Sequence, residues 1–100
     1  MKSLLVAGAL GALLSVGSAL AGPIDQACIR ANRTASAELC GCIQRVADMT
    51  LSGSDQKLAA SFFADPARAQ EVRQSDRQSL RAFWGRYMTF GSAAEDVCSG

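Results

Sequence analysis

The chain has 100 residues, with four cysteines, no histidine, and ten Lys and Arg residues against nine Asp and Glu residues. A net charge of +1 argues against nucleic acid or an anionic membrane as the main partner, since both are bound through an excess of basic residues. The lack of histidine removes the most common general base.

Residues 1–21, MKSLLVAGALGALLSVGSALA, have the pattern of a secretory signal peptide. Lys2 precedes an uncharged run that closes on small residues around a cut after Ala21. We therefore expect export to the periplasm and a mature chain, residues 22–100, with no membrane segment. The alternatives are an uncleaved membrane anchor and a lipoprotein, which is disfavoured because Asp25-Gln26-Ala27 precedes Cys28 where a lipobox would stand.

The mature part predicts one all-α domain, a small disulfide-stapled bundle of four to five short helices, because helix-forming residues dominate and strand-like alternation is missing. The first helix is predicted over 24–33, after Pro23. The second is predicted over 37–51, with Ser36 as N-cap, and Ser52-Gly53-Ser54 is expected to end it. Helical spacing predicts their buried faces: Ile24, Ala27, Cys28 and Ala31 on the first, and Leu39, Ile43, Val46 and Thr50 on the second.

Three further helices follow in the prediction. One covers 55–64 and another covers 66–73, with Asp65 as N-cap and Pro66 at the first helical position. The last and longest follows Ser75-Asp76-Arg77-Gln78, which has the form of a capping box. Apolar residues recur on these helices at three- and four-residue steps: Leu58, Ala59, Phe62 and Phe63, then Leu80, Phe83, Trp84, Tyr87, Met88, Phe90, Gly91, Ala94, Val97 and Cys98.

The pair Cys40-Gly41-Cys42 is the most specific motif in the chain. An even number of cysteines in a small exported chain predicts a disulfide framework. Residues two apart on a helix point about 200° apart, so the two sulfurs should pair with different partners rather than with each other. We expect one to bond Cys28 and the other Cys98, and we weakly prefer Cys28–Cys42 with Cys40–Cys98.

The same pair has two other interpretations, a thiolate site for a soft metal such as copper and a redox-active pair. Met49 follows Cys42 and is the nearest additional soft ligand in the sequence. Without histidine the metal interpretation is weak, and we expect no metal site and no cofactor.

No catalytic residues are predicted, because no nucleophile motif accompanies the missing histidine. The aromatic stripe of the last helix is expected to be core. Trp84 and Tyr87 carry polar groups and are therefore the best candidates for an exposed binding surface. The arginines of residues 67–81 alternate with acids, which favours a solvated face over an anion-binding one.

The chain also resembles a known family. The resemblance rests on GPIDQAC (22–28), LCGCIQRVAD (39–48), the runs of residues 54–76, AFWGRY (82–87) and the final Cys98. On these motifs it looks like a family of small exported cysteine-containing proteins of alphaproteobacteria, of the Rhodobacter kind, whose members often carry the automatic label "arginine transporter". The resemblance covers essentially all of the mature chain and brings no catalytic or binding residues with it.

Three hypotheses follow. The first is a non-enzymatic, disulfide-stabilised interaction module of the cell envelope, whose partner is an envelope protein. The second, which the family label implies, is an accessory or small-solute binder in arginine transport, with Asp48, Asp65 or Glu71 near Trp84. A two-lobed binding protein is excluded because 79 residues (100 − 21) are too few for two lobes. The third is a periplasmic thiol-redox or copper-handling protein.

Overall fold

The computed structural model describes residues 22–31 and 35–99, and the predicted signal peptide lies outside these residues. The described part contains only helices, which confirms the all-α prediction. They are α2 (Pro23–Ala31), α3 (Ala37–Thr50), α4 (Gly53–Ala64), α5 (Pro66–Arg73) and α6 (Gln78–Cys98).

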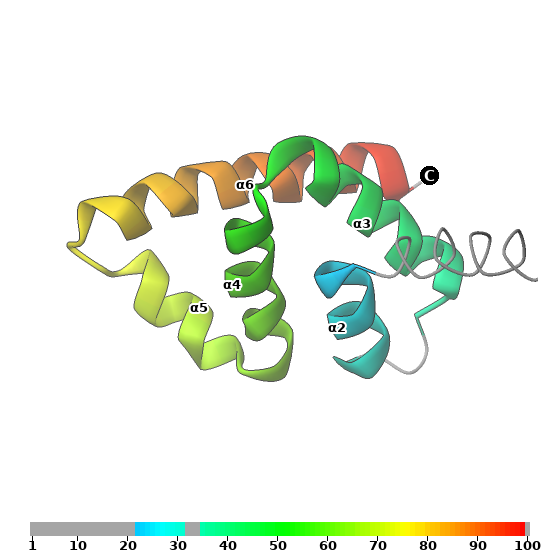
Figure 1. Ribbon diagram of the computed structural model, residues 1–100, viewed down its shortest axis with the longest axis horizontal. Coiled ribbons are helices and arrows are strands. Elements are labelled where there is room, and N and C mark those ends of the chain that lie inside the picture. Colours follow the sequence, from blue (N-terminus) through cyan, green and yellow to red (C-terminus); the bar gives the residue numbers. More distant parts are fainter. Residues whose placement is uncertain (1–21, 32–34, 100) are drawn as a thin grey trace, which may run out of the picture.

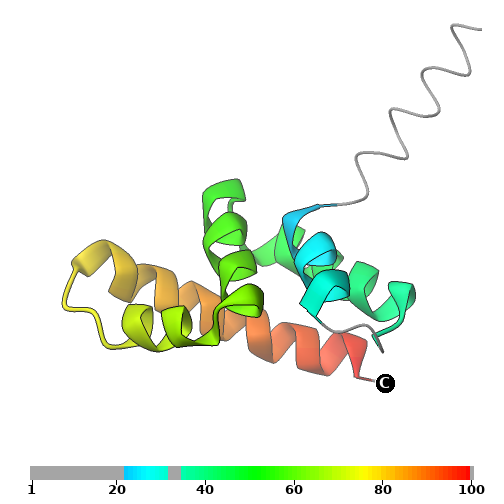
Figure 2. The same cartoon turned by 90° about the horizontal axis from the view of Figure 1, so that it is seen from below.

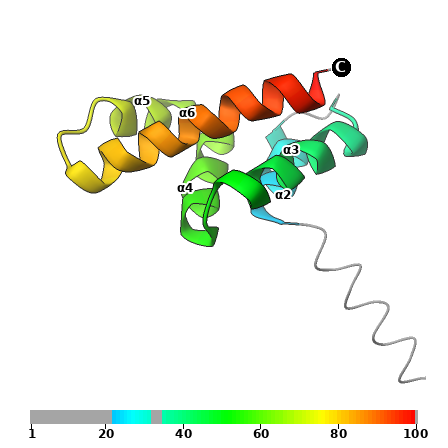
Figure 3. The same cartoon turned by 90° about the horizontal axis from the view of Figure 1, so that it is seen from above.

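Helix α6 is the longest helix, and α3, α4 and α5 all pack against it (Figure 1). Helix α5 lies beside its N-terminal half, α4 crosses near its middle, and α3 runs along its C-terminal half, as the views from below and above also show (Figures 2 and 3). Helix α2 packs against α3 and α4. The first and last described helices, α2 and α6, are therefore linked mainly through α3 and α4.

The helix boundaries follow the predicted ones closely, but one predicted cap is wrong. Ser52-Gly53-Ser54 does not only end α3: Ser52 is the N-cap of α4, and its hydroxyl accepts a hydrogen bond from Asp55 N at 3.2 Å. Asp65 is the N-cap residue of α5 and Pro66 its first helical residue, as predicted, although the Asp65 side chain makes no capping hydrogen bond. The Ser75 hydroxyl accepts from Arg77 N at 3.1 Å, so it closes a local turn and does not cap α6, which begins at Gln78.

Every described helix contributes to one hydrophobic core. Its buried members are Ile24, Val46, Ala47, Leu51, Ala59, Phe62, Val72, Phe83 and Phe90. Phe62 of α4 is the centre of its aromatic part: it meets Phe83 and Tyr87 of α6 edge-to-face, with centroids 6.0 and 5.3 Å apart. These ring pairs, favourable beyond simple burial, fix α4 across α6.

The predicted stripe of α6 is too wide. Phe83 and Phe90 are buried, whereas Met88 is 57% and Val97 63% exposed, because α6 has neighbours on one side only. The described helices include none that is both long and apolar enough to cross a membrane.

Candidate functional site

Two disulfides hold the bundle together, Cys28–Cys40 and Cys42–Cys98, with Cα atoms 5.7 and 5.9 Å apart. The prediction that Cys40 and Cys42 have different partners is confirmed. The preferred pairing, Cys28–Cys42 with Cys40–Cys98, is wrong.

The pairing follows from the face of α3 that meets each neighbour. Cys40 is fully buried and lies one turn before Gln44, whose side chain contacts α2. Cys42 lies on the other face, close to Leu39 and Ile43, which line a groove with Cys98. The predicted stripe placed Leu39 at its centre, but Leu39 is 38% exposed. A stripe with Leu39 at its centre leaves Cys40 and Cys42 on its two flanks, so it does not decide which of them faces α2.

All four cysteines of the chain are therefore in disulfides. Structural disulfides persist in oxidising compartments and are rare in the cytosol. The two bonds indicate an oxidising location outside the cytosol.

A buried amide network connects α2, α3 and α4. The Gln44 carbonyl oxygen accepts from Asp25 N at 2.9 Å, and its amide nitrogen donates to Asp48 Oδ1 and Gln56 Oε1, both at 2.8 Å. Gln56 donates in turn to Asp48 Oδ1 and Leu51 O. Asp25 N is one of the first amides of α2, so Gln44 supplies from another helix the cap that Gly22 has no side chain to make.

Gly22 itself is required by this arrangement. A Cβ at position 22 would lie 2.5 Å from Gln44 Cδ and Oε1. The Gln44 amide is held on several sides and cannot move without losing hydrogen bonds. The glycine is thus explained by close approach.

The described part has one ion pair, between α4 and α6. Asp55 is buried, and its carboxylate accepts from Arg86 Nε at 2.7 Å and Nη2 at 3.0 Å, a two-pronged geometry. The Arg86 hydrogen bond and charge hold the pKa of Asp55 below its ordinary value, although burial acts in the opposite direction. The pair joins the N-terminal turn of α4 to the middle of α6.

Asp55 should make the stability of the protein depend on pH. Because its folded-state pKa is depressed, its contribution is present above the unfolded value of about 3.9 and is lost as pH falls through the folded value. Asp55→Asn should therefore lower the unfolding free energy at pH 7, and the gap to the wild type should narrow below about pH 4. Urea unfolding at pH 7, 4 and 3 measures this, with exposed Asp76→Asn as matched control. A gap that stays constant down to pH 3 would contradict it.

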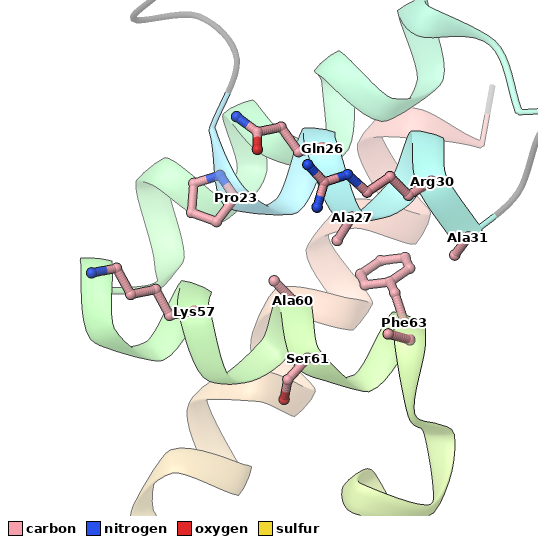
Figure 4. A pocket seen from close by; sticks show the side chains of 10 residues that line it. Pro23, Gln26, Ala27, Arg30, Ala31, Lys57, Ala60, Ser61 and Phe63 are labelled. Carbon is pink, nitrogen blue, oxygen red and sulfur yellow. The ribbon is translucent and has the colours of Figure 1, made fainter.

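A groove of about 430 Å³ lies between α2 and α4 (Figure 4). It exists because both helices present small residues to it at helical spacing: Ala27 and Ala31 on α2, and Ala60 and Ala64 on α4. Methyl groups leave the space between the helices incompletely filled. The ring of Phe63 covers one end of the apolar floor.

The charged groups that line this α2–α4 groove are both cations. Arg30 extends from the α2 wall and Lys57 from the α4 wall (Figure 4). Both are exposed, and in residues 22–31 and 35–99 neither forms an ion pair. No acidic residue lines the groove. The groove can therefore hold an anionic group above an apolar floor.

A second groove, of about 400 Å³, lies between α3 and α6 beside the Cys42–Cys98 bond. Leu39, Ile43 and Ala94 make it apolar, and Glu95 is its only charged residue. It can accept an apolar group with at most one positive charge.

Trp84 and Tyr87 are half-buried, and neither lines these two grooves. Tyr87 packs on Phe62, Trp84 and Phe90, and this burial raises the pKa of its phenol. Their role as a binding surface stays a prediction. The acids proposed for an arginine site do not line the two grooves either: Asp48 belongs to the Gln44 network, and Asp65 and Glu71 are exposed.

No cluster of three or more His, Cys, Asp or Glu side chains able to hold a metal occurs in the described part of the chain. Met49 is 75% exposed.

Sequence reasoning missed the groove and its cations, Arg30 and Lys57. The available signal was the row of alanines on two neighbouring helices.

No known family model, curated protein or solved structure matches the chain.

Proposed function

We propose that this protein is a small, non-enzymatic binding module of the cell envelope, exported to the periplasm, with the α2–α4 groove as its binding surface. The groove itself supports the proposal: it is an apolar cavity of small-molecule size, and the two cations on its walls form no ion pair with any residue that the structure describes. Its walls are rigidly placed, because Cys28–Cys40 and the Gln44 network attach α2 to α3, and the core attaches α4 to α6.

Export is supported by two independent features. Residues 1–21 have the signal-peptide pattern, and the two disulfides suit an oxidising compartment. A protein of this kind should occur in the periplasmic fraction, beginning at Gly22 and carrying no free thiol. Intact-mass and thiol analysis of the exported protein tests this, and two free thiols at Cys40 and Cys42 would favour the redox or copper alternative.

The arginine label is the rival proposal. A guanidinium ligand would be repelled by Arg30 and Lys57 in the α2–α4 groove, so it would have to use Glu95 in the α3–α6 groove. The two proposals therefore place the ligand in different grooves.

Backbone amide NMR of the exported, oxidised protein separates them. A panel of small anionic, neutral and cationic solutes that includes arginine should shift amides of residues 26–31 and 57–64. Arginine-induced shifts confined to residues 39–43 and 94–99 would support the rival. If no solute of any charge shifts the α2–α4 amides, the proposed binding surface is wrong.

A further inference from the structure

The α2–α4 groove combines two chemistries that a single ligand can satisfy. Ala27 of α2 and Ala60 of α4 face each other across it, and Phe63 adds an aromatic surface at one end (Figure 4). Arg30 lies along the α2 wall and Lys57 extends outward from the α4 wall at the Pro23 end, so both cations belong to the rim of the groove (Figure 4). An apolar floor below a cationic rim is complementary to an amphipathic anion.

Resting on the proposed function, we propose that the groove binds an aliphatic monocarboxylate, with its hydrocarbon chain on the alanine and phenylalanine floor and its carboxylate at the cationic rim, where Arg30 is the direct partner and Lys57 adds positive charge. The size of the cavity favours a small molecule over a polypeptide, since about 430 Å³ lies at the lower end of the range of small-molecule sites, about 300–1,000 Å³. The planar guanidinium of Arg30 can donate two parallel hydrogen bonds to a carboxylate.

The charge pattern around the groove supports an anion rather than a neutral amphiphile. Among the described residues, two cations and no acid line the groove. A bound carboxylate therefore gains an electrostatic attraction that an alcohol of the same chain length does not. Because both cations are exposed, their contribution should be modest and should fall as salt increases.

The test compares octanoate with octanol and octylammonium, which share the chain and differ in charge, on the exported, oxidised protein by calorimetry and amide NMR. We expect octanoate to bind with shifts at residues 26–31 and 57–64, and to bind more tightly than octanol. Octylammonium should be the weakest. Each methylene added from hexanoate to octanoate should raise the affinity by up to about fourfold.

Matched variants identify the cations. Arg30→Gln and Lys57→Gln should each weaken octanoate binding by about two- to fivefold and leave octanol binding unchanged. The control variants Arg68→Gln and Arg81→Gln each remove the same single charge from exposed sites of α5 and α6 outside the groove, and each should bind octanoate as the wild type does. All variants replace exposed residues, and equal melting temperatures verify their folding.

Equal binding of octanol and octanoate at the groove overturns the carboxylate assignment but leaves the binding module intact. The same holds if octylammonium binds best. If none of these probes shifts residues 26–31 and 57–64, the carboxylate assignment is also overturned. The solute panel then decides separately whether the groove binds anything.

Discussion

Removal of the Cys42–Cys98 disulfide, by Cys42→Ala with Cys98→Ala, should lower the free energy of unfolding by about 4 kcal/mol. Removal of Cys28–Cys40 by the matching pair of alanines should cost about 3 kcal/mol. The two bonds close segments with sequence separations of 56 and 12 residues, and a longer closed segment restricts the unfolded chain more. Since small domains have only about 5–15 kcal/mol of stability in total, either loss is large.

Urea unfolding followed by circular dichroism measures both double variants. Paired substitutions are used because a single one would leave a reactive thiol. The chain-entropy explanation would be contradicted if the short bond proved more important than the long one by more than 1 kcal/mol, a result that would point instead to native-state packing around the fully buried Cys40. Amide exchange would then be fastest in α2 rather than in α6.

The order of the helices could be predicted from the sequence because local signals mark each boundary. Pro23, Ser36 and Pro66 stand at or next to helix starts in both the prediction and the structure. These signals act within a few residues and need no knowledge of the partner helices. The one error in capping, at Ser75, occurs because its hydroxyl accepts from Arg77 N, two residues ahead, while α6 begins only at Gln78.

The disulfide pairing could not be predicted because it depends on how α3 is rotated relative to two neighbours. Spacing alone shows that Cys40 and Cys42 point apart, but it does not show which of them faces α2. A stripe centred on Leu39 leaves the choice open, whereas the buried stripe through Cys40, Gln44, Ala47 and Leu51 turns Cys40 toward α2. The second stripe contains a buried glutamine, and a polar residue in a helix normally indicates the solvent side.

The candidate site was hidden from the sequence for a related reason. Alanines on an amphipathic helix predict a buried face, yet here α2 and α4 are too far apart across part of that face for methyl groups to fill the space. Arg30 and Lys57 are 27 positions apart in the chain, and only the packing of α2 on α4 brings them to one groove. A site made by two helix faces is a tertiary property, whereas the aromatic stripe of α6 was conspicuous and is mainly core.

The Gln44 network is the polar counterpart of the disulfides, and Gln44→Leu should lower the free energy of unfolding by about 3 kcal/mol. Leucine has a similar volume but leaves Asp25 N and Gln56 Oε1 without the hydrogen bonds that Gln44 provides. Each buried polar group left unpaired costs about 1–3 kcal/mol. The buried leucine surface offsets only part of this cost. Urea unfolding measures the loss.

Gln70→Leu is the matched control, because Gln70 is exposed on α5 and its replacement should change stability by no more than about 0.5 kcal/mol. Gln44→Glu adds a second check: it keeps an acceptor for Asp25 N but places a carboxylate beside Asp48, so its destabilisation should be larger at pH 7 than in mild acid.

Equal stability of Gln44→Leu and wild type would mean that the network satisfies polar groups without stabilising the fold. A loss confined to α2, seen as faster amide exchange of residues 24–31, would show that Gln44 specifically holds one wall of the α2–α4 groove. Octanoate binding should then weaken although no residue lining the groove has changed.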